Sequence, residues 1–255
     1  MPNFSLANKT ALVTGAARGI GQAIAVGLAE HGASLVLWDL EYSALEETAH
    51  QVCALGPECR CFQVDIADWD AVQKAVDTTD FWGIDVCVNN AGVVAKPTPF
   101  ETMTAEEWHR VMEVNLDGTA AVCRSVGMQM KRMGQHGSII NIGSMSGLVA
   151  NKGFYNSVYN ASKAGILQLT RSLACEWARY GIRVNSIAPG PIQTPMSDGL
   201  KERDPALYKE FGGRTAIGRW GLPSEVVGAV VYLASDASSF VTGSALVCDG
   251  GYTAW

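Results

Sequence analysis

A short apolar segment followed by a glycine-rich turn restricts the fold of this chain more than any other feature. Residues 10–14 read Thr-Ala-Leu-Val-Thr, which is typical of a buried strand, and a turn with Gly15, Gly19 and Gly21 follows directly. A helical pattern of apolar residues begins at the end of the turn. This order brings backbone amides and a helix dipole to one point, where they can bind a phosphate. The segment therefore predicts the first unit of a nucleotide-binding α/β fold.

The spacing of these glycines separates the turn from two other phosphate loops. It reads G-x-x-x-G-x-G, whereas long dinucleotide folds carry G-x-G-x-x-G. No Gly-Lys-Ser/Thr follows, which excludes a Walker-type site. Glycines also mark ordinary strand–helix turns, so the turn alone does not establish a cofactor site.

The rest of the chain alternates between strand and helix patterns without a linker or repeat. Further strands are predicted over residues 33–38, 59–64, 84–88, 138–142, 182–187 and 245–247, and helices over 105–133, 155–180 and 224–233. We therefore expect one domain, residues 1–255, with an α/β fold: a single doubly wound Rossmann-type parallel sheet of about seven strands with helices on both faces. The polar, glycine-interrupted residues 195–214 are expected to form a substrate lid.

Composition argues against several other classes of protein. The net charge of −6 disfavours a nucleic-acid surface, which needs a basic face. No apolar run approaches the roughly 20 residues of a membrane span, and no leader pattern precedes the first strand, so we expect a cytoplasmic protein. The seven cysteines lack the spacing of a zinc or redox motif, and no metal site is predicted.

The predicted second strand ends in Asp39, at the distance from the glycine turn where an acid can bind both hydroxyls of an adenine ribose. This carboxylate would repel the 2′-phosphate of NADP. Arg18 is a counter-argument, because a cation beside the turn could pair with that phosphate. Since Asp39 holds the discriminating position, NAD is favoured over NADP. Asp39 could also cap a helix that starts near Tyr42.

Polar residues also follow the third and fourth predicted strands. Asp65 could meet the adenine amino group, or it could be an ordinary turn or cap residue. Residues 89–92 read Asn-Asn-Ala-Gly, and their small side chains would let the chain pass close to a ligand, although asparagine in a turn usually satisfies its own backbone. Asn115 interrupts the apolar stripe of the helix over 105–133. It is either a core residue satisfied by neighbours, or it kinks the helix and holds a water.

The segment from Gly143 to Lys163 carries the strongest chemical signal. Ser144 follows the predicted fifth strand at its carboxyl end, where open parallel sheets bind ligands. Tyr159 and Lys163 lie four residues apart on a predicted helix and therefore on one face. An ammonium there is expected to lower the Tyr159 pKa from about 10, so that the phenol exchanges a proton near neutral pH. An isolated pair of this kind would more often be a surface contact, but the glycine turn favours a functional role.

The same segment matches G-x-S-x-G, the nucleophile elbow of α/β hydrolases, with Ser146 as the nucleophile. A hydrolase of this type needs a histidine later in the chain. All four histidines precede Ser146, so we reject this interpretation.

Together these residues resemble the short-chain dehydrogenase/reductase family from about Lys9 to the C-terminus. Six pieces in family order carry the match: Thr14-Gly15…Gly19-Ile20-Gly21, Asn89-Asn90-Ala91-Gly92, Asn115, Ser144, Tyr159-x-x-x-Lys163 and Pro189-Gly190. The resemblance implies that Tyr159 is the general acid/base and that Ser144 binds the substrate oxygen. It also implies that Lys163 binds the nicotinamide ribose and that Asn115 holds a water that carries protons to solvent.

The resemblance implies the residues that bind the dinucleotide as well. They are Gly15, Arg18, Gly19, Ile20, Gly21, Asp39, Leu40, Asp65, Ile66, Asn90, Ala91, Gly92, Tyr159, Lys163, Pro189, Gly190, Ile192 and Thr194. The implied reaction is reversible hydride transfer between NAD(H) and a secondary alcohol or ketone, and the implied assembly is a homotetramer.

Two details bear on the substrate. The sequences of residues 143–147 and of the C-terminal residues 250–255 look most like those of polyol and sugar-alcohol dehydrogenases of this family. The interval from Ser144 to Tyr159 is about two residues longer than is usual for the family, which would change the shape of the entrance to the substrate-binding site. One alternative is an NADP(H)-dependent reductase of ketones or 3-oxoacyl thioesters. Another is a non-catalytic dinucleotide-binding regulator, although the complete Ser, Tyr, Lys and Asn set argues against it.

Overall fold

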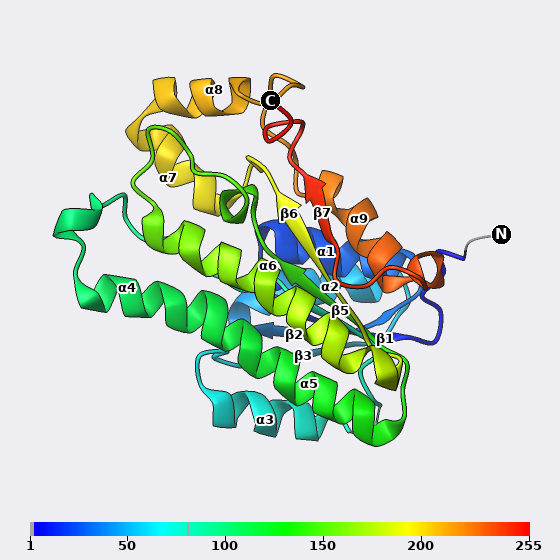
Figure 1. The fold of residues 1–255 in the computed structure, drawn as a ribbon. Helices are drawn as coiled ribbons and strands as arrows, with labels where there is room; N and C mark the ends of the chain where they lie inside the picture. Colours follow the sequence, from blue (N-terminus) through cyan, green and yellow to red (C-terminus); the bar gives the residue numbers. More distant parts are fainter. Residues whose placement is uncertain (1–2, 81) are drawn as a thin grey trace.

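The computed structural model describes residues 3–80 and 82–255. Within this part of the chain, seven parallel strands form one sheet in the order β3-β2-β1-β4-β5-β6-β7 (Figure 1). The predicted α/β fold with one doubly wound parallel sheet is confirmed. The strands are β1 (Thr10–Thr14), β2 (Ser34–Asp39), β3 (Cys59–Gln63), β4 (Val86–Asn89), β5 (Ser138–Ile142), β6 (Arg183–Pro189) and β7 (Ala245–Cys248).

Helices cover both faces of the sheet (Figure 1). One face carries α1 (Gly19–Glu30), α2 (Glu46–Ala54) and α9 (Ser224–Ala234), and the other carries α3 (Trp69–Thr78), α5 (Thr119–Met133) and α6 (Ser157–Trp177). Successive side chains of a strand enter opposite cores: Leu12 packs with α3 and α5, whereas Val13 packs with α1 and α9. Because both faces are buried, the strands appear in the sequence as continuous apolar runs.

The strand order reverses between β1 and β4, which creates the crevice where such sheets bind ligands. β1 ends at Thr14 and β4 at Asn89, so the glycine turn and the 89–92 segment leave the sheet as neighbours. β5 lies beside β4 and ends at Ile142, just before Ser144. The predicted cofactor and catalytic segments therefore share the carboxyl edge of the sheet.

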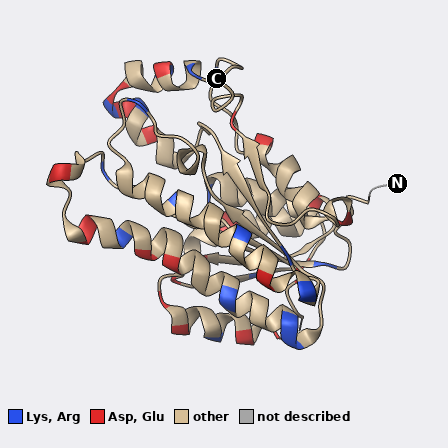
Figure 2. Cartoon of the chain, viewed as in Figure 1, with Lys and Arg blue, Asp and Glu red and all other residues tan. Residues whose placement is uncertain are grey.

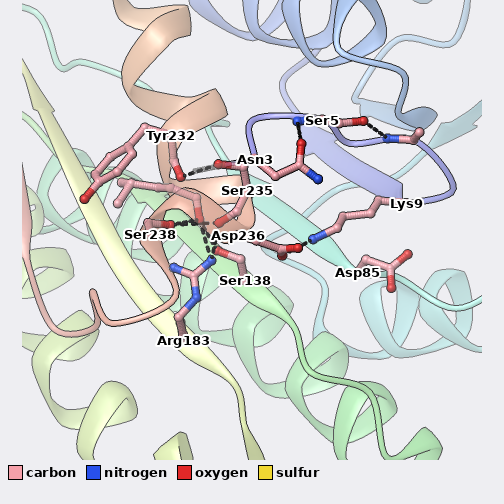
Figure 3. Close-up of polar contacts among 12 residues, drawn as sticks. Asn3, Ser5, Lys9, Asp85, Ser138, Arg183, Tyr232, Ser235, Asp236 and Ser238 are labelled. Carbon is pink, nitrogen blue, oxygen red and sulfur yellow. Dashed lines mark hydrogen bonds and ion pairs between the residues drawn. The ribbon is translucent and has the colours of Figure 1, made fainter. Parts of the chain in front are cut away.

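Polar contacts close the opposite, amino edge of the sheet (Figure 3). The Arg183 guanidinium, at the start of β6, donates to the carbonyl oxygens of Leu233 and Ser235 at 2.8 and 3.3 Å. The Ser138 hydroxyl, at the start of β5, donates to the Leu233 carbonyl at 2.7 Å. These bonds tie the end of α9 to the beginnings of two strands.

Charged residues lie mainly on the helices and their ends, whereas the strands are mostly uncharged in the view of Figure 2. In the described part of the chain, no helix combines the length and apolar character needed to cross a bilayer. The described residues also contain no group of three or more His, Cys, Asp or Glu side chains placed to hold a metal ion.

Two segments differ in detail from the predicted elements. The helix predicted over 105–133 is α4 (Ala105–Met112) and α5 joined by a π-helical turn, Glu113–Gly118. The residues predicted as a lid, 195–214, form two short helices, α7 (Pro195–Arg203) and α8 (Pro205–Gly213). Both lie beyond the carboxyl end of β6 in Figure 1.

Candidate functional site

The glycine turn between β1 and α1 packs tightly against the segment that follows β4. Gly15 has a φ of +62°, which favours glycine, and a Cβ there would lie 2.8 Å from the Cα of Ala91. A Cβ on Gly21 would collide with the carbonyl oxygen of Gly15. The backbone of the turn is therefore held in one place at the crevice.

Thr14 holds the two segments together, although the sequence pattern does not single it out as a site residue. Its Oγ1 accepts hydrogen bonds from the backbone amides of Asn90 and Ala91, both at 3.1 Å. The Asn90 side chain donates in return to the carbonyl oxygens of Thr14 and Gly15, at 3.0 and 2.9 Å. The Asn90 amide thus satisfies the backbone of the glycine turn instead of its own. A hydroxyl residue that ends the strand before a glycine turn is the signal for this role.

The N-terminus of α1 is suited to an anion. Arg18 is its N-cap residue, no side chain caps the helix, and no acidic residue lies in its first turn. The first amides therefore remain available, and the helix dipole favours negative charge there. The Arg18 side chain is exposed and has no ion pair among the described residues. These features fit the pyrophosphate of a dinucleotide.

Asp39 faces the glycine turn from the end of β2. Its carboxylate accepts hydrogen bonds from the backbone amides of Ala17 at 3.0 Å and Leu40 at 2.8 Å. The 3-10 turn that follows Tyr42 has no side-chain cap. The structure therefore decides against the helix-cap alternative and places a half-buried acid beside the turn.

Asp65 and Ile66 follow β3. The Asp65 carboxylate accepts from the amide of Ala67 at 2.9 Å, so the turn role considered for it is present. Asp68 is the cap residue of α3, because its carboxylate accepts hydrogen bonds from the backbone amides of Asp70 and Ala71. Ile66 is buried against Gly118 of the π turn. A role for Asp65 and Ile66 toward adenine stays a prediction.

The four predicted catalytic residues come together at the carboxyl edge. Ser144 follows β5 and is buried, and its side chain is hydrogen-bonded to that of Tyr159. The Lys163 ammonium lies 5.7 Å from the centre of the Tyr159 ring. A Cβ on Gly92 would lie 3.6 Å from Lys163 Nζ and 3.1 Å from Asn115 Oδ1. The segment after β4 therefore lies close to both Lys163 of α6 and Asn115 of the π turn.

Asn115 is fully buried within the π turn, and its side chain is satisfied by neighbours. Its Oδ1 accepts from the Val93 amide at 2.8 Å, and its Nδ2 donates to the Val93 carbonyl and to Ser162 Oγ at 2.9 and 3.0 Å. The Ser162 hydroxyl donates to the Tyr159 carbonyl at 2.8 Å. The structure supports the first alternative, because Asn115 is a buried residue satisfied by its neighbours, and it lies in a π turn where the helix departs from α geometry. The bound water stays a prediction.

The pKa expected for Tyr159 from its spacing to Lys163 is wrong in direction. Burial raises the Tyr159 pKa, and only the Ser144 hydrogen bond acts to lower it. Spacing on a helix fixes the face of a lysine but not the direction of its long side chain, and Lys163 Nζ donates to the carbonyl oxygen of Ile142 at 2.8 Å. At neutral pH Tyr159 therefore holds its proton, which is the form that can donate to a carbonyl.

Burial also lowers the Lys163 pKa from 10.5 to about 8. Between these two values the unfolded chain binds a proton that the folded protein has lost, so the free energy of unfolding rises with pH. We expect the stability of the wild type relative to a Lys163→Met variant to rise by about 3 kcal/mol between pH 7 and pH 10.5. Urea unfolding at a series of pH values measures this difference, and the other titrating groups cancel because both proteins contain them.

A Lys152→Met variant is the control for this pH dependence. The Lys152 side chain is exposed, so this variant shows whether replacing a surface lysine by methionine produces the same dependence on pH. A constant difference between the wild type and the Lys163→Met variant would show that Lys163 keeps its ordinary pKa.

The segment that follows β6 lies close to the glycine turn. The Gly190 amide donates to the Cys248 carbonyl at 3.0 Å, and Ile192 is buried in a parallel bridge with Gly221. Thr194, the N-cap residue of α7, lies so that a Cβ on Gly19 would be 3.5 Å from its Cβ. Thr194, which the family resemblance assigns to dinucleotide binding, thus borders the glycine turn.

An aromatic cluster joins α7 and α8 to the loop after Ser144. The ring centroid of Phe211 in α8 lies 4.4 Å from that of Phe154 in the loop, 5.5 Å from that of Trp220 and 5.5 Å from that of Tyr252. Met145 and Leu200 pack in the same cluster. The segment predicted as a lid is therefore connected by apolar contacts to the loop that follows Ser144.

Comparison with known proteins covers almost the whole chain. The family model described as enoyl-(acyl carrier protein) reductase matches residues 15–253. Galactitol 2-dehydrogenase (L-tagatose-forming) from Cereibacter sphaeroides is 41% identical over 253 residues, covering 99% of this chain and 98% of that protein. An NADP-dependent mannitol dehydrogenase from Hypocrea jecorina is 40% identical over 98% of this chain and 94% of its own length. The crystal structure of a gluconate 5-dehydrogenase from Burkholderia cenocepacia, in complex with NADP and tartrate, matches with a TM-score of 0.93 and 37% identity, over 100% of this chain and 98% of that chain.

Proposed function

Because the chain belongs to the short-chain dehydrogenase/reductase family, we propose that it transfers a hydride between NAD(H) and a secondary alcohol or ketone, with a polyol or sugar alcohol as its substrate. The observation that carries the proposal is the meeting of Ser144, Tyr159, Lys163 and Asn115 beside the glycine turn. The relatives named for galactitol and mannitol support the polyol class.

The residues of the site fit a nicotinamide dinucleotide, which supplies the hydride acceptor or donor when bound. The uncapped N-terminus of α1 would hold the pyrophosphate and Asp39 the adenine ribose. Ser144 would bind the substrate oxygen and stabilise its developing charge, and Tyr159 would take or return the proton. Lys163 would bind the nicotinamide ribose.

A substrate screen tests this function. The purified protein is incubated with NAD⁺ or NADP⁺ and a panel of polyols and simple secondary alcohols, and with NADH or NADPH and 3-oxoacyl thioesters, while reduced nicotinamide is followed by absorbance. Reduction of NAD⁺ by polyols is the expected result. Turnover of thioesters with NADPH alone would favour the reductase alternative. Binding of NADH without turnover of any substrate would favour a regulator.

The preference for NAD rests on Asp39. An Asp39→Ala variant is expected to lower the ratio of kcat/KM with NAD⁺ to kcat/KM with NADP⁺ by about tenfold or more, because a carboxylate repels the 2′-phosphate. Glu41→Ala is the matched control, since this exposed acid lies two residues further on and its removal should leave the ratio unchanged. One relative of this chain is named as NADP-dependent, so the cofactor preference has to be measured with both cofactors. An unaltered ratio in the Asp39→Ala variant would show that other residues determine the preference between NAD and NADP.

We further propose that the protein is a cytoplasmic homotetramer. Apolar side chains exposed on the protomer support the assembly: Met128 and Met133 on α5 and Trp255 at the C-terminus, which is 83% exposed. Light scattering coupled to size exclusion measures the oligomeric state.

A further inference from the structure

The loop between Ser144 and Tyr159 holds a buried amide with an unused hydrogen-bond acceptor. Asn151 is only 6% exposed, and its Nδ2 donates to Ser146 Oγ at 2.6 Å. Its Oδ1 finds no hydrogen-bond donor among the described residues. Buried carbonyl oxygens in native proteins nearly always accept a hydrogen bond, because an unpaired one costs free energy. Asn151 therefore presents an acceptor that the described fold does not satisfy.

Ser146 places this amide beside the catalytic serine. Its backbone amide donates to Ser144 Oγ at 3.1 Å, and its hydroxyl oxygen accepts from Asn151. The hydrogen of that hydroxyl has no acceptor among the residues described. The Ser146 hydroxyl is therefore a free hydrogen-bond donor, and Asn151 Oδ1 is a free acceptor. These two side chains are hydrogen-bonded to each other and lie next to Ser144, which contacts Tyr159.

Contacts on both sides fix the position of Asn151. The Phe154 amide donates to the Asn151 carbonyl at 3.1 Å, and the Phe154 ring packs on Phe211 of α8. Arg214 Nη1 donates to the carbonyl oxygen of Lys152 at 2.6 Å. The loop is thus held by the lid segment, and the Asn151 side chain is oriented before any ligand binds.

We propose that Asn151 and Ser146 form a binding subsite for a second hydroxyl group of the substrate, close to the carbon that reacts at Ser144 and Tyr159. A hydroxyl group is both a donor and an acceptor, so one ligand hydroxyl satisfies Asn151 Oδ1 and accepts from the Ser146 hydroxyl. The subsite rests on the proposed dehydrogenase function and narrows its substrate class to polyols with a hydroxyl on a neighbouring carbon. Alcohols with a single hydroxyl leave both groups unpaired.

The experiment compares a vicinal diol with the alcohol that lacks its second hydroxyl. The kcat/KM values of the wild type, Asn151→Ala and Ser146→Ala are measured with 2,3-butanediol and with 2-butanol, and the ratio of diol to alcohol is expected to fall about tenfold to a hundredfold in both variants. Thermal unfolding and NADH binding show whether either variant has lost its fold. Lys152→Ala is the control, because its exposed side chain lies next to Asn151 and only its backbone carbonyl bonds to Arg214.

The outcomes separate the subsite from the proposed function. A diol-to-alcohol ratio that stays at the wild-type value in folded Asn151→Ala and Ser146→Ala proteins overturns the subsite and leaves the dehydrogenase intact. A wild-type protein that oxidises neither compound with either cofactor, nor any polyol of the screen, overturns the proposed function and the subsite with it. A ratio that falls in both variants but not in Lys152→Ala supports the subsite.

Discussion

Replacing Tyr159 by phenylalanine is expected to lower kcat by about a thousandfold with the best alcohol substrate, because the ring then lacks the hydroxyl that exchanges the proton. The substitution keeps the packing of the ring, and neither Ser144 nor Lys163 depends on this hydroxyl for its backbone contacts. NADH binding, measured by fluorescence titration, should therefore be retained. The separation of binding from turnover distinguishes loss of proton transfer from loss of structure.

Tyr155→Phe is the matched control for this result. Tyr155 lies four residues before Tyr159 and is 59% exposed, so removing its hydroxyl should leave kcat near the wild-type value. Turnover near the wild-type rate in Tyr159→Phe would remove Tyr159 from the proposed role. An equal loss in both variants would indicate damage to the loop and not to the proton transfer.

A Gly21→Ala variant is expected to lose cofactor binding almost completely. The added Cβ would collide with the Gly15 carbonyl oxygen and lie 2.5 Å from Asn90 Nδ2. Neither group can yield easily, because Asn90 is already bonded to both Thr14 and Gly15. The N-terminus of α1 must therefore move, and we expect a dissociation constant for NADH at least about a hundredfold larger and a loss of about 1–3 kcal/mol in the free energy of unfolding.

Gly228→Ala provides the comparison for Gly21→Ala. Gly228 lies in the interior of α9, and a Cβ there meets no atom within 4 Å. Alanine at this exposed helical position should stabilise the protein by about 0.5–1 kcal/mol, since it lowers the entropy of the unfolded chain. Urea unfolding of the two variants measures the contrast. Wild-type stability and NADH affinity in Gly21→Ala would contradict the close packing of the turn.

Local sequence patterns predict most of this fold because its strands and turns depend on neighbours in the chain. Residues 138–142 form β5 with the predicted bounds, because a short apolar run is typical of a strand buried on both faces. The approach of Ser144 to Tyr159 follows from the strand end and the helix face on which each lies. The order of motifs along the chain was therefore sufficient to assemble the candidate site.

The features that could not be predicted depend on contacts between distant residues. The direction of the Lys163 side chain is set by the Ile142 carbonyl, twenty-one positions away, and spacing within a helix carries no information about it. Likewise, the unpaired oxygen of Asn151 is visible only when every neighbour is placed. The role of Thr14 also depends on a segment more than seventy residues further along the chain.

The start of α8 was predictable in principle. The Asp204-Pro205 pair suggests a chain break, but it begins a helix. The Asp204 carboxylate accepts from the Leu207 amide at 2.9 Å, and proline is well suited to the first helical position because no intrahelical partner exists there for its missing amide hydrogen. The same pair of residues can thus end one helix and begin the next.

The π turn between α4 and α5 makes this stretch of chain sensitive to any change in its length. Each residue of an α-helix advances about 100° around the axis, and a π turn accommodates an extra residue without interrupting the helix. Loss of one residue from Glu113–Gly118 would restore continuous α geometry and swing the Asn115 amide by about 100° relative to α5, away from Val93 and Ser162. Point substitutions on the outer surface of this helix are therefore tolerable in a way that single-residue deletions within it are not.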